Sequence, residues 1–216
     1  MIIFIQFFVL LFTFQTAECY FFDIYDNMTT VEIDANDGNS QDQFGYSVSL
    51  WDKYLLIGAP FHDSENESNI GKAYLFNYFV GGRWIYQSSI INDNGYKGED
   101  FGENVVISGS GSGLYAIISA GGSTDSSYIL NGYCYTYKIQ DSKWIKMNTL
   151  TGDDDSNDRF GKSIDISINR EYSKNNYNDY DFVIIGAPYD DKSGYTGFYG
   201  SAYIYSPNDT NSHTHK

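Results

Sequence analysis

The chain has 216 residues, with 28 acidic against 13 basic side chains and a formal net charge of -15. A strongly acidic protein disfavours nucleic acid and anionic membranes as partners, because their phosphate groups would be repelled. Glycine and tyrosine, at 21 residues each, suit turns and pleated strands better than helices, so the composition favours an all-β fold.

The N-terminus begins with a short apolar run, IIFIQFFVLLFTF, over residues 2–14. The run is too short to span a bilayer comfortably and is followed by the small residue Ala17, so we expect a secretory signal over residues 1–19. It carries no lysine or arginine ahead of the apolar run. We expect a secreted or extracellular protein with no membrane span, and three sequons are glycosylation candidates: Asn27, Asn66 and Asn208.

The chain has two cysteines, and the position of signal cleavage decides whether they can form a disulfide. Cleavage after Ala17 leaves Cys19 available to pair with Cys134, whereas cleavage after Cys19 leaves Cys134 alone. The spacing leaves both possibilities open.

One phrase occurs three times along the rest of the chain. Each copy begins with an aromatic-glycine pair, continues as an apolar run and reaches a turn of small residues. A further shared stretch then follows, which reads "GKAYLFN", "NGYCYTYK" and "GSAYIYS" in the three copies. The first two copies continue into a tryptophan strand, "RWIYQSSI" and "KWIKMNTL". A unit repeated in this way cannot bury its own face and must stack against its neighbours.

Each copy is expected to form short strands joined by turns. In the first copy these are "GYSVSL", "YLLIGA", "KAYLFNYF" and "RWIYQSSI", which alternate in polarity or form continuous apolar runs. The second strand should end at Gly58-Ala59-Pro60, where the glycine can take positive φ and the proline ends the hydrogen-bonded ladder.

These phrases resemble FG-GAP repeats, the blades of the β-propeller of integrin α-subunits and of many secreted microbial proteins. The resemblance covers residues 29–206 and implies β-propeller-type blades of four antiparallel strands, about three in number. The repeats are expected at about 29–77, 84–138 and 144–206, inside a region of residues 20–206 that precedes a polar tail of residues 207–216. In the second copy Ser119, Ala120 and Gly121 replace the GAP triplet. The matching positions are Phe44, Gly45, Gly58, Ala59, Pro60, Phe101, Gly102, Phe160, Gly161, Gly186, Ala187 and Pro188.

The blade assignment predicts an acidic face. In a four-strand meander, the loops between strands 2 and 3 share one end with the loops that join successive blades. Those two sets of loops hold 16 acidic residues against three bases: Lys97, Arg159 and Lys192. We expect a ligand to bind there, although Asp and Asn are also preferred turn formers and each one could serve only its turn.

Calcium is the metal that such a face suggests. Integrin blades that bind a metal share a D-x-D-x-D-G loop between strands 1 and 2, because a hard cation needs several converging oxygens. No loop at that position here has this pattern. The remaining calcium candidates are Asp153, Asp155 and Asn157, which have ligand spacing, but Asp158 stands where the glycine should be. We therefore expect no cofactor beyond this candidate calcium.

Nothing in the repeats indicates catalysis. His62 is the one histidine outside the tail and is interpreted as a solvated loop residue, and no serine lies in a G-x-S-x-G turn. The sequence therefore predicts a non-enzymatic binding or adhesion module for an extracellular protein or glycan. The alternative is an accessory propeller domain of a larger secreted hydrolase or lyase.

The number of blades raises a problem of closure. Propellers close with about 4 to 8 blades, and three copies fall short of a ring. Residues 29–34, TTVEID, are expected to form a fourth-type strand without a blade, while the last blade ends with "SAYIYS" and lacks its outer strand. We expect an open array with an unpaired edge and two exposed apolar blade faces, both of which invite self-association. In solution the chain is expected either to pair with a second copy, approaching six blades, or to be a fragment of a longer protein. We expect Phe44, Phe101 and Phe160 to be buried at equivalent positions between blades.

Overall fold

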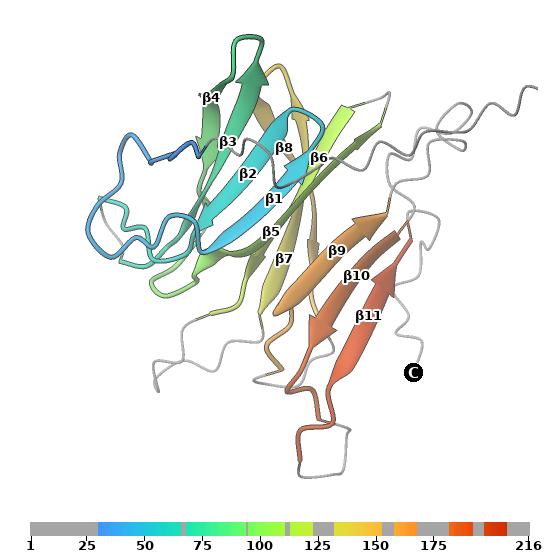
Figure 1. Ribbon diagram of the computed structural model, residues 1–216. Coiled ribbons are helices and arrows are strands. Elements are labelled where there is room, and N and C mark those ends of the chain that lie inside the picture. The colour runs from blue at the N-terminus through green and yellow to red at the C-terminus, as the bar shows by residue number, and fades with distance from the viewer. Residues whose placement is uncertain are drawn as a thin grey trace, which may run out of the picture. The chain divides into compact units, whose positions relative to one another are not determined.

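A computed structural model describes residues 30–65, 68–93, 95–110, 113–122, 132–152, 158–167, 182–191 and 197–206. The chain divides into two compact units, Met1–Glu32 and Ile33–Lys216, and all of the described strands belong to the second. These strands form three antiparallel sheets (Figure 1). The described residues include no helix long and apolar enough to cross a membrane.

Each sheet is a meander whose strands neighbour one another in chain order, and we call the three sheets blades 1, 2 and 3. Blade 1 consists of β1 (Ser47–Trp51), β2 (Tyr54–Ala59), β3 (Lys72–Phe79) and β4 (Arg83–Ile90). Blade 2 consists of β5 (Phe101–Ser110), β6 (Gly113–Ala120), β7 (Tyr133–Gln140) and β8 (Lys143–Leu150). Blade 3 consists of β9 (Ser163–Ser167), β10 (Phe182–Ala187) and β11 (Ser201–Tyr205).

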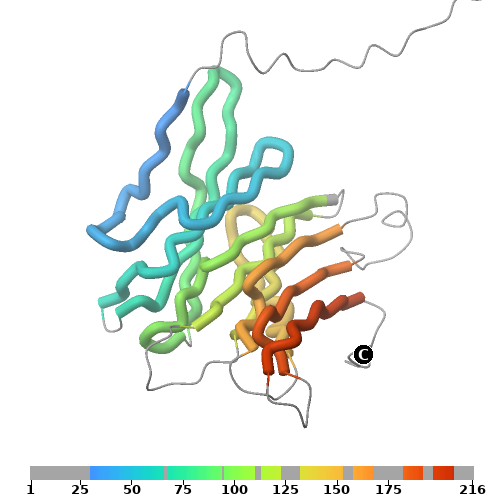
Figure 2. Tube along the Cα trace, turned by 60° about the horizontal axis from the view of Figure 1, so that its bottom comes forward, coloured from blue at the N-terminus to red at the C-terminus, as the bar shows by residue number. Residues whose placement is uncertain are grey.

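This arrangement confirms the predicted all-β blades. The Cα trace passes from one sheet to the next in order (Figure 2), and strands of blade 1 contact β5 while β5 contacts β9 of blade 3. Strands β2 and β10 end at Ala59 and Ala187, one residue before a proline, as expected. Among the described residues, blade 3 has three strands and no outer fourth strand, which is also as expected.

The predicted strand over residues 29–34 is wrong for the part that the structure describes, because residues 30–34 belong to no strand. Ile33 and Ala35 instead pack on a buried cluster of blade 1 that includes Ile57 and Tyr74. The physical reason is that no sheet edge is paired with the segment, whereas an apolar face is available to its side chains. One of the two blade faces that we expected to be exposed is therefore partly covered.

The phenylalanines of the three FG pairs occupy equivalent positions. Phe101 and Phe160 are fully buried, as predicted, whereas Phe44 is half-buried. Each ring packs against two aromatic rings on the third strand of its own blade, with centroids 5.2 to 6.3 Å apart. Phe44 is less buried because no blade precedes it in the described structure. The six partner rings are Tyr74, Phe76, Tyr135, Tyr137, Tyr203 and Tyr205.

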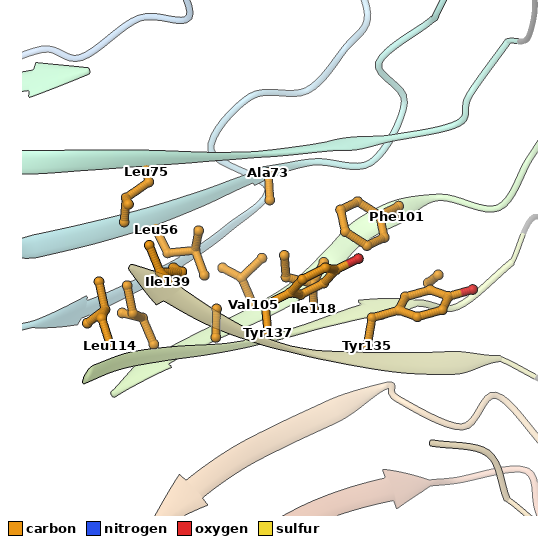
Figure 3. Close-up of a cluster of buried hydrophobic side chains, with 13 residues drawn as sticks. Leu56, Ala73, Leu75, Phe101, Val105, Leu114, Ile118, Tyr135, Tyr137 and Ile139 are labelled. Carbon is orange, nitrogen blue, oxygen red and sulfur yellow. The ribbon is translucent and has the colours of Figure 1, made fainter. Parts of the chain in front are cut away.

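Two of the hydrophobic clusters among the described residues lie between blades, and a third lies on one face of blade 1. Leu56, Ala73 and Leu75 of blade 1 join one cluster with blade 2 residues such as Phe101 and Ile118 (Figure 3). A second cluster joins blade 2 to blade 3 through Ile117, Cys134, Phe160, Val183, Ile185, Ala187 and Tyr203. Each blade is therefore stabilised by its neighbour, as expected for a repeat that cannot bury its own face.

The glycines of the motif have different roles from those expected. Gly58 and Gly186 of the GAP triplets do not have positive φ, so that expectation is wrong. Positive φ occurs instead at the FG glycines, with 90° at Gly45, 96° at Gly102 and 92° at Gly161. Gly58 is needed for space, since a Cβ there would lie 2.1 Å from the carbonyl oxygen of Gly102 in blade 2.

Candidate binding face

The two predicted sets of loops lie together at one end of the blades, as expected. In blade 1 the Phe61 amide donates to the carbonyl of Asp42, at 3.3 Å. The same bond recurs from Gly122 to Glu99 in blade 2 and from Tyr189 to Asp158 in blade 3, at 3.1 and 3.2 Å. Each bond joins the loop after the second strand to the loop that enters the blade. We call this end the loop face.

Further hydrogen bonds join blade 1 to the segment that enters blade 2. The amides of Gly98, Asp100 and Phe101 donate to carbonyls of residues 68–70, at 3.1 to 3.3 Å. The loop face is therefore a hydrogen-bonded framework rather than a set of independent turns.

A buried acid precedes each FG pair at the same spacing, and the sequence patterns considered above did not predict it. The residue two positions before each phenylalanine is a buried acid: Asp42, Glu99 or Asp158. The residue between them has positive φ, 54° at Gln43, 56° at Asp100 and 50° at Arg159. The signal was present as acid-x-F-G in all three copies.

His62 is buried, so its interpretation as a solvated loop residue is wrong. Its Nδ1 lies 2.8 Å from Oδ2 of Asp42, and the same oxygen accepts a hydrogen bond from the Asn39 amide at 3.0 Å. The sequence could not show this pairing, because the partner lies in an earlier loop on the other side of two strands. His62 and Asp42 together fasten the two loops of blade 1.

Glu99 is the corresponding carboxylate of blade 2. Its Oε1 accepts hydrogen bonds from the Asn92 side chain and the Tyr135 hydroxyl, both at 2.7 Å. Burial raises the pKa of Glu99 above its usual range, while the hydrogen bonds from Tyr135 and Asn92 oppose that rise. This acid therefore joins the segment that enters blade 2 to the third strand of that blade.

Asp100 is buried next to Glu99 and has an unusual protonation equilibrium. Its Oδ1 has no hydrogen-bond partner among the residues that the structure describes. Burial and then repulsion from Glu103 raise the pKa of Asp100 to about 7, against an ordinary value of 3.8. A substantial share of Asp100 is therefore protonated at neutral pH.

The surface charge of the loop face is smaller than the sequence count suggests. Of its 16 acids, five are buried in the framework: Asp42, Glu99, Asp100, Asp158 and Asp190. Asp190, for example, accepts a hydrogen bond of 2.7 Å from the Tyr203 hydroxyl. The exposed acids of the described loops are Asp34, Asp37, Asp63, Glu65 and Asp93. Several of the acids thus serve the structure of the loops, which was the alternative to ligand binding. The exposed ones leave a negatively charged surface.

Exposed aromatic rings lie on the same face in blade 3. Tyr189 and Phe198 meet edge to face with centroids 5.0 Å apart, and the Arg159 guanidinium lies 4.7 Å from the Tyr189 ring. Tyr199 is also exposed. We call Tyr189, Phe198, Tyr199 and Arg159 the aromatic patch. It combines apolar rings with a cation, which is the composition of strong binding sites.

The remaining site candidates lie outside the described residues. These are the calcium candidates Asp153, Asp155 and Asn157, the sequons at Asn27, Asn66 and Asn208, and the base Lys192. Within the described part of the chain, no group of three or more His, Cys, Asp or Glu side chains is arranged to hold a metal ion.

Cys134 lies in the core between blades 2 and 3 and forms no disulfide within the described residues. A Cβ built on Gly161 of blade 3 would lie 2.9 Å from its sulfur. Burial raises the pKa of the Cys134 thiol, which disfavours the reactive thiolate. Its possible partner Cys19 is not among the described residues.

Comparison with known proteins bears on the first copy of the motif. Residues 28–76 match the family model of the FG-GAP repeat. The match includes Phe44-Gly45 and Gly58-Ala59-Pro60, the residues whose geometry is described above. No curated protein matches the chain.

Proposed function

We propose that this chain, an FG-GAP repeat protein built of β-propeller-type blades, is a secreted or cell-surface binding module without catalytic activity. Its ligand would be an extracellular protein or glycan, bound at the loop face. The apolar run of residues 2–14 supports secretion.

The aromatic patch is the observation that carries this proposal. Tyr189, Phe198 and Tyr199 are all exposed. Tyrosine and arginine are enriched among the residues that dominate binding energy. Aromatic rings also stack on the apolar faces of sugars. The nearby exposed carboxylates would favour basic groups on a protein ligand.

The absence of catalysis is supported by how the polar side chains are used. His62 is buried and bonded to Asp42, and Glu99 is bonded to Asn92 and Tyr135. A general acid or base must reach a substrate, whereas these groups serve the contacts between loops.

Binding by the mature chain, residues 20–216, tests the proposal. The chain would be used to capture extracellular proteins and to probe a glycan array, beside the variants Tyr189→Ser and Phe198→Ser. A matched control is Val80→Ser, which removes an exposed apolar side chain at the tip of the β3–β4 hairpin, outside the loop face. We expect the two patch variants to lose binding by about tenfold or more and the control to retain it. Equal binding by all variants would overturn the proposal.

A further inference from the structure

Blade 3 exposes an apolar surface, whereas the equivalent surfaces of blades 1 and 2 are buried by the blade that follows each. Strand register makes the positions equivalent, because Gly58 pairs with Ser47 and Ala73 just as Gly186 pairs with Ser163 and Ala202. Leu56 and Leu75 of blade 1 are 0% and 1% exposed, since blade 2 covers them. The equivalent residues of blade 3, Ile184 and Ile204, are 44% and 66% exposed.

A backbone socket accompanies this surface. A Cβ on Gly71 would lie 2.1 Å from the Phe101 carbonyl oxygen, and one on Gly132 would lie 2.2 Å from that of Phe160. Each glycine thus accommodates the FG pair of the following blade. Gly200 has the same place and a similar φ of 71°, but its nearest neighbour is Pro188 of its own blade, at 3.2 Å. The third socket holds no FG pair among the described residues.

Blade 1 carries the surface that would fit this socket. Val48 and Leu50 of β1 are 63% and 62% exposed. Their equivalents in β5, Val105 and Ile107, are buried in the core against blade 1. Blade 1 therefore presents, without a covering blade, the face by which blade 2 packs on blade 1.

The segment before blade 1 fits the same junction. Ile33 precedes Phe44 by the same number of residues as Ile90 precedes Phe101, so the two isoleucines are equivalent. Ile90 is the last residue of β4 and pairs with Ala73 of β3. Residues 33–35 thus occupy the place where the outer strand of a preceding blade would end. Blade 3 lacks that outer strand among the described residues, so Ala202 of β11 has an edge position where Ile33 of another copy would pair.

We propose that a second copy of this chain docks head to tail, with its blade 1 on the exposed face of blade 3. The second copy is the occupant because the contact would repeat a junction that the chain already forms twice, between blades 1 and 2 and between blades 2 and 3. Phe44-Gly45 would enter the socket at Gly200, and Leu50 would approach Ile184 and Ile204. The contact joins different surfaces of the two copies, and its site at Gly200 directly adjoins Phe198 and Tyr199 of the aromatic patch.

Sedimentation of the mature chain, residues 20–216, across a concentration series tests this junction. The variant Ile204→Lys places a charge on the exposed apolar surface of blade 3, and Leu50→Lys places one on the exposed face of blade 1. Val80→Lys is the matched control, since it makes the same change at an exposed apolar residue on a hairpin tip. Ile184→Ser is a second variant of the blade 3 surface, and the thermal unfolding of every variant shows whether its fold is retained.

We expect the wild-type chain and the control to associate, and each junction variant to bind at least about tenfold more weakly. A mixture of Ile204→Lys and Leu50→Lys should recover a one-to-one dimer, because the unchanged blade 3 surface of Leu50→Lys fits the unchanged blade 1 face of Ile204→Lys. A wild-type monomer at about 100 μM would overturn the proposal. Association of Leu50→Lys as strong as that of the wild-type chain would also overturn it, since this would indicate that two blade 3 surfaces pair with each other. A mixture of the two lysine variants that stays monomeric would overturn it as well.

Discussion

Gly58 of blade 1 lies directly against Gly102 of blade 2, so that two backbones meet where the blades join. A Cβ on Gly58 would stand 2.1 Å from the Gly102 carbonyl oxygen, and the Ser47 hydroxyl donates a hydrogen bond of 2.8 Å to that same oxygen. At this junction the GAP triplet of blade 1 and the FG pair of blade 2 are therefore parts of a single contact. Ser119 stands in place of the glycine at the next junction, so the contact between two glycines belongs to blades 1 and 2.

The first prediction concerns Gly58→Ala, with Gly186→Ala as its matched control. The change at Gly58 should lower the free energy of unfolding by about 2 kcal/mol, because the new methyl group meets backbone that cannot move aside. The equivalent methyl at Gly186 meets only Ser163, whose hydroxyl can rotate away. Denaturant unfolding of both variants measures the difference. Equal losses of stability would show that contact between blades is not the cause.

The second prediction compares the phenylalanines of the FG pairs. Phe101→Ala should cost about 3 to 5 kcal/mol, because a fully buried ring is replaced by a cavity. Phe44→Ala should cost clearly less, since Phe44 is half-buried at the free end of the array. Thermal and denaturant unfolding measure both. If Phe44→Ala proved as costly as Phe101→Ala, something would have to cover blade 1 beyond residues 33–35.

Most of the fold could be predicted from the sequence because the determining contacts are local and repeated. Alternation and apolar runs correctly located the strands, and the proline after Ala59 correctly located a strand end. The error over residues 29–34 has a different origin. A strand needs a partner edge, and strand propensity along a segment cannot show whether that edge is present.

The sequence predicted which loops form the loop face, but not which of their acids are buried. Strand parity brought the correct loops together, and hydrogen bonds such as that from Phe61 to Asp42 confirm this. Charge counting could not distinguish buried acids from exposed ones, because Asp42 and Asp63 look alike in a polar loop. The repeated acid-x-F-G spacing was the available signal, since a residue that recurs in step with a structural motif usually serves that motif.

The third prediction is that Asp100→Asn stabilises the protein at alkaline pH. The folded state raises the pKa of Asp100 from 3.8 to about 7, so between these values the folded chain binds more protons than the unfolded chain. The stability contributed by Asp100 is therefore present below about pH 4 and is lost as the pH rises through about 7. Asparagine is always neutral and tolerates the φ of 56° at this position.

Melting temperatures at pH 5 and pH 8 check this prediction. The variant should exceed the wild-type chain at pH 8, with the gap shrinking at pH 5. A gap that does not change with pH would mean that Asp100 does not titrate in this range.

The fourth prediction concerns the buried pair His62 and Asp42. His62→Ala leaves the Asp42 carboxylate buried with one fewer partner, which should cost about 1 to 3 kcal/mol. In a double-mutant cycle with Asp42→Ala, the combined loss should be smaller than the sum of the single losses, because each change removes the same contact. Additive losses would show that the two side chains do not act together.

The last prediction concerns the exposed acids of the loop face. Glu65 and Asp93 are both exposed, so the double variant Glu65→Gln, Asp93→Asn removes two surface charges without disturbing the buried framework. A basic protein ligand should associate with it about two- to threefold more slowly than with the wild-type chain at low ionic strength, and the difference should fade as salt is added. The matched control is Asp52→Asn, Asp141→Asn, which removes two charges from the β1–β2 and β7–β8 turns, away from the loop face. Association rates measured by surface plasmon resonance over a salt series distinguish the two variants. Equal slowing by both would mean that net charge, rather than the loop face, steers the ligand.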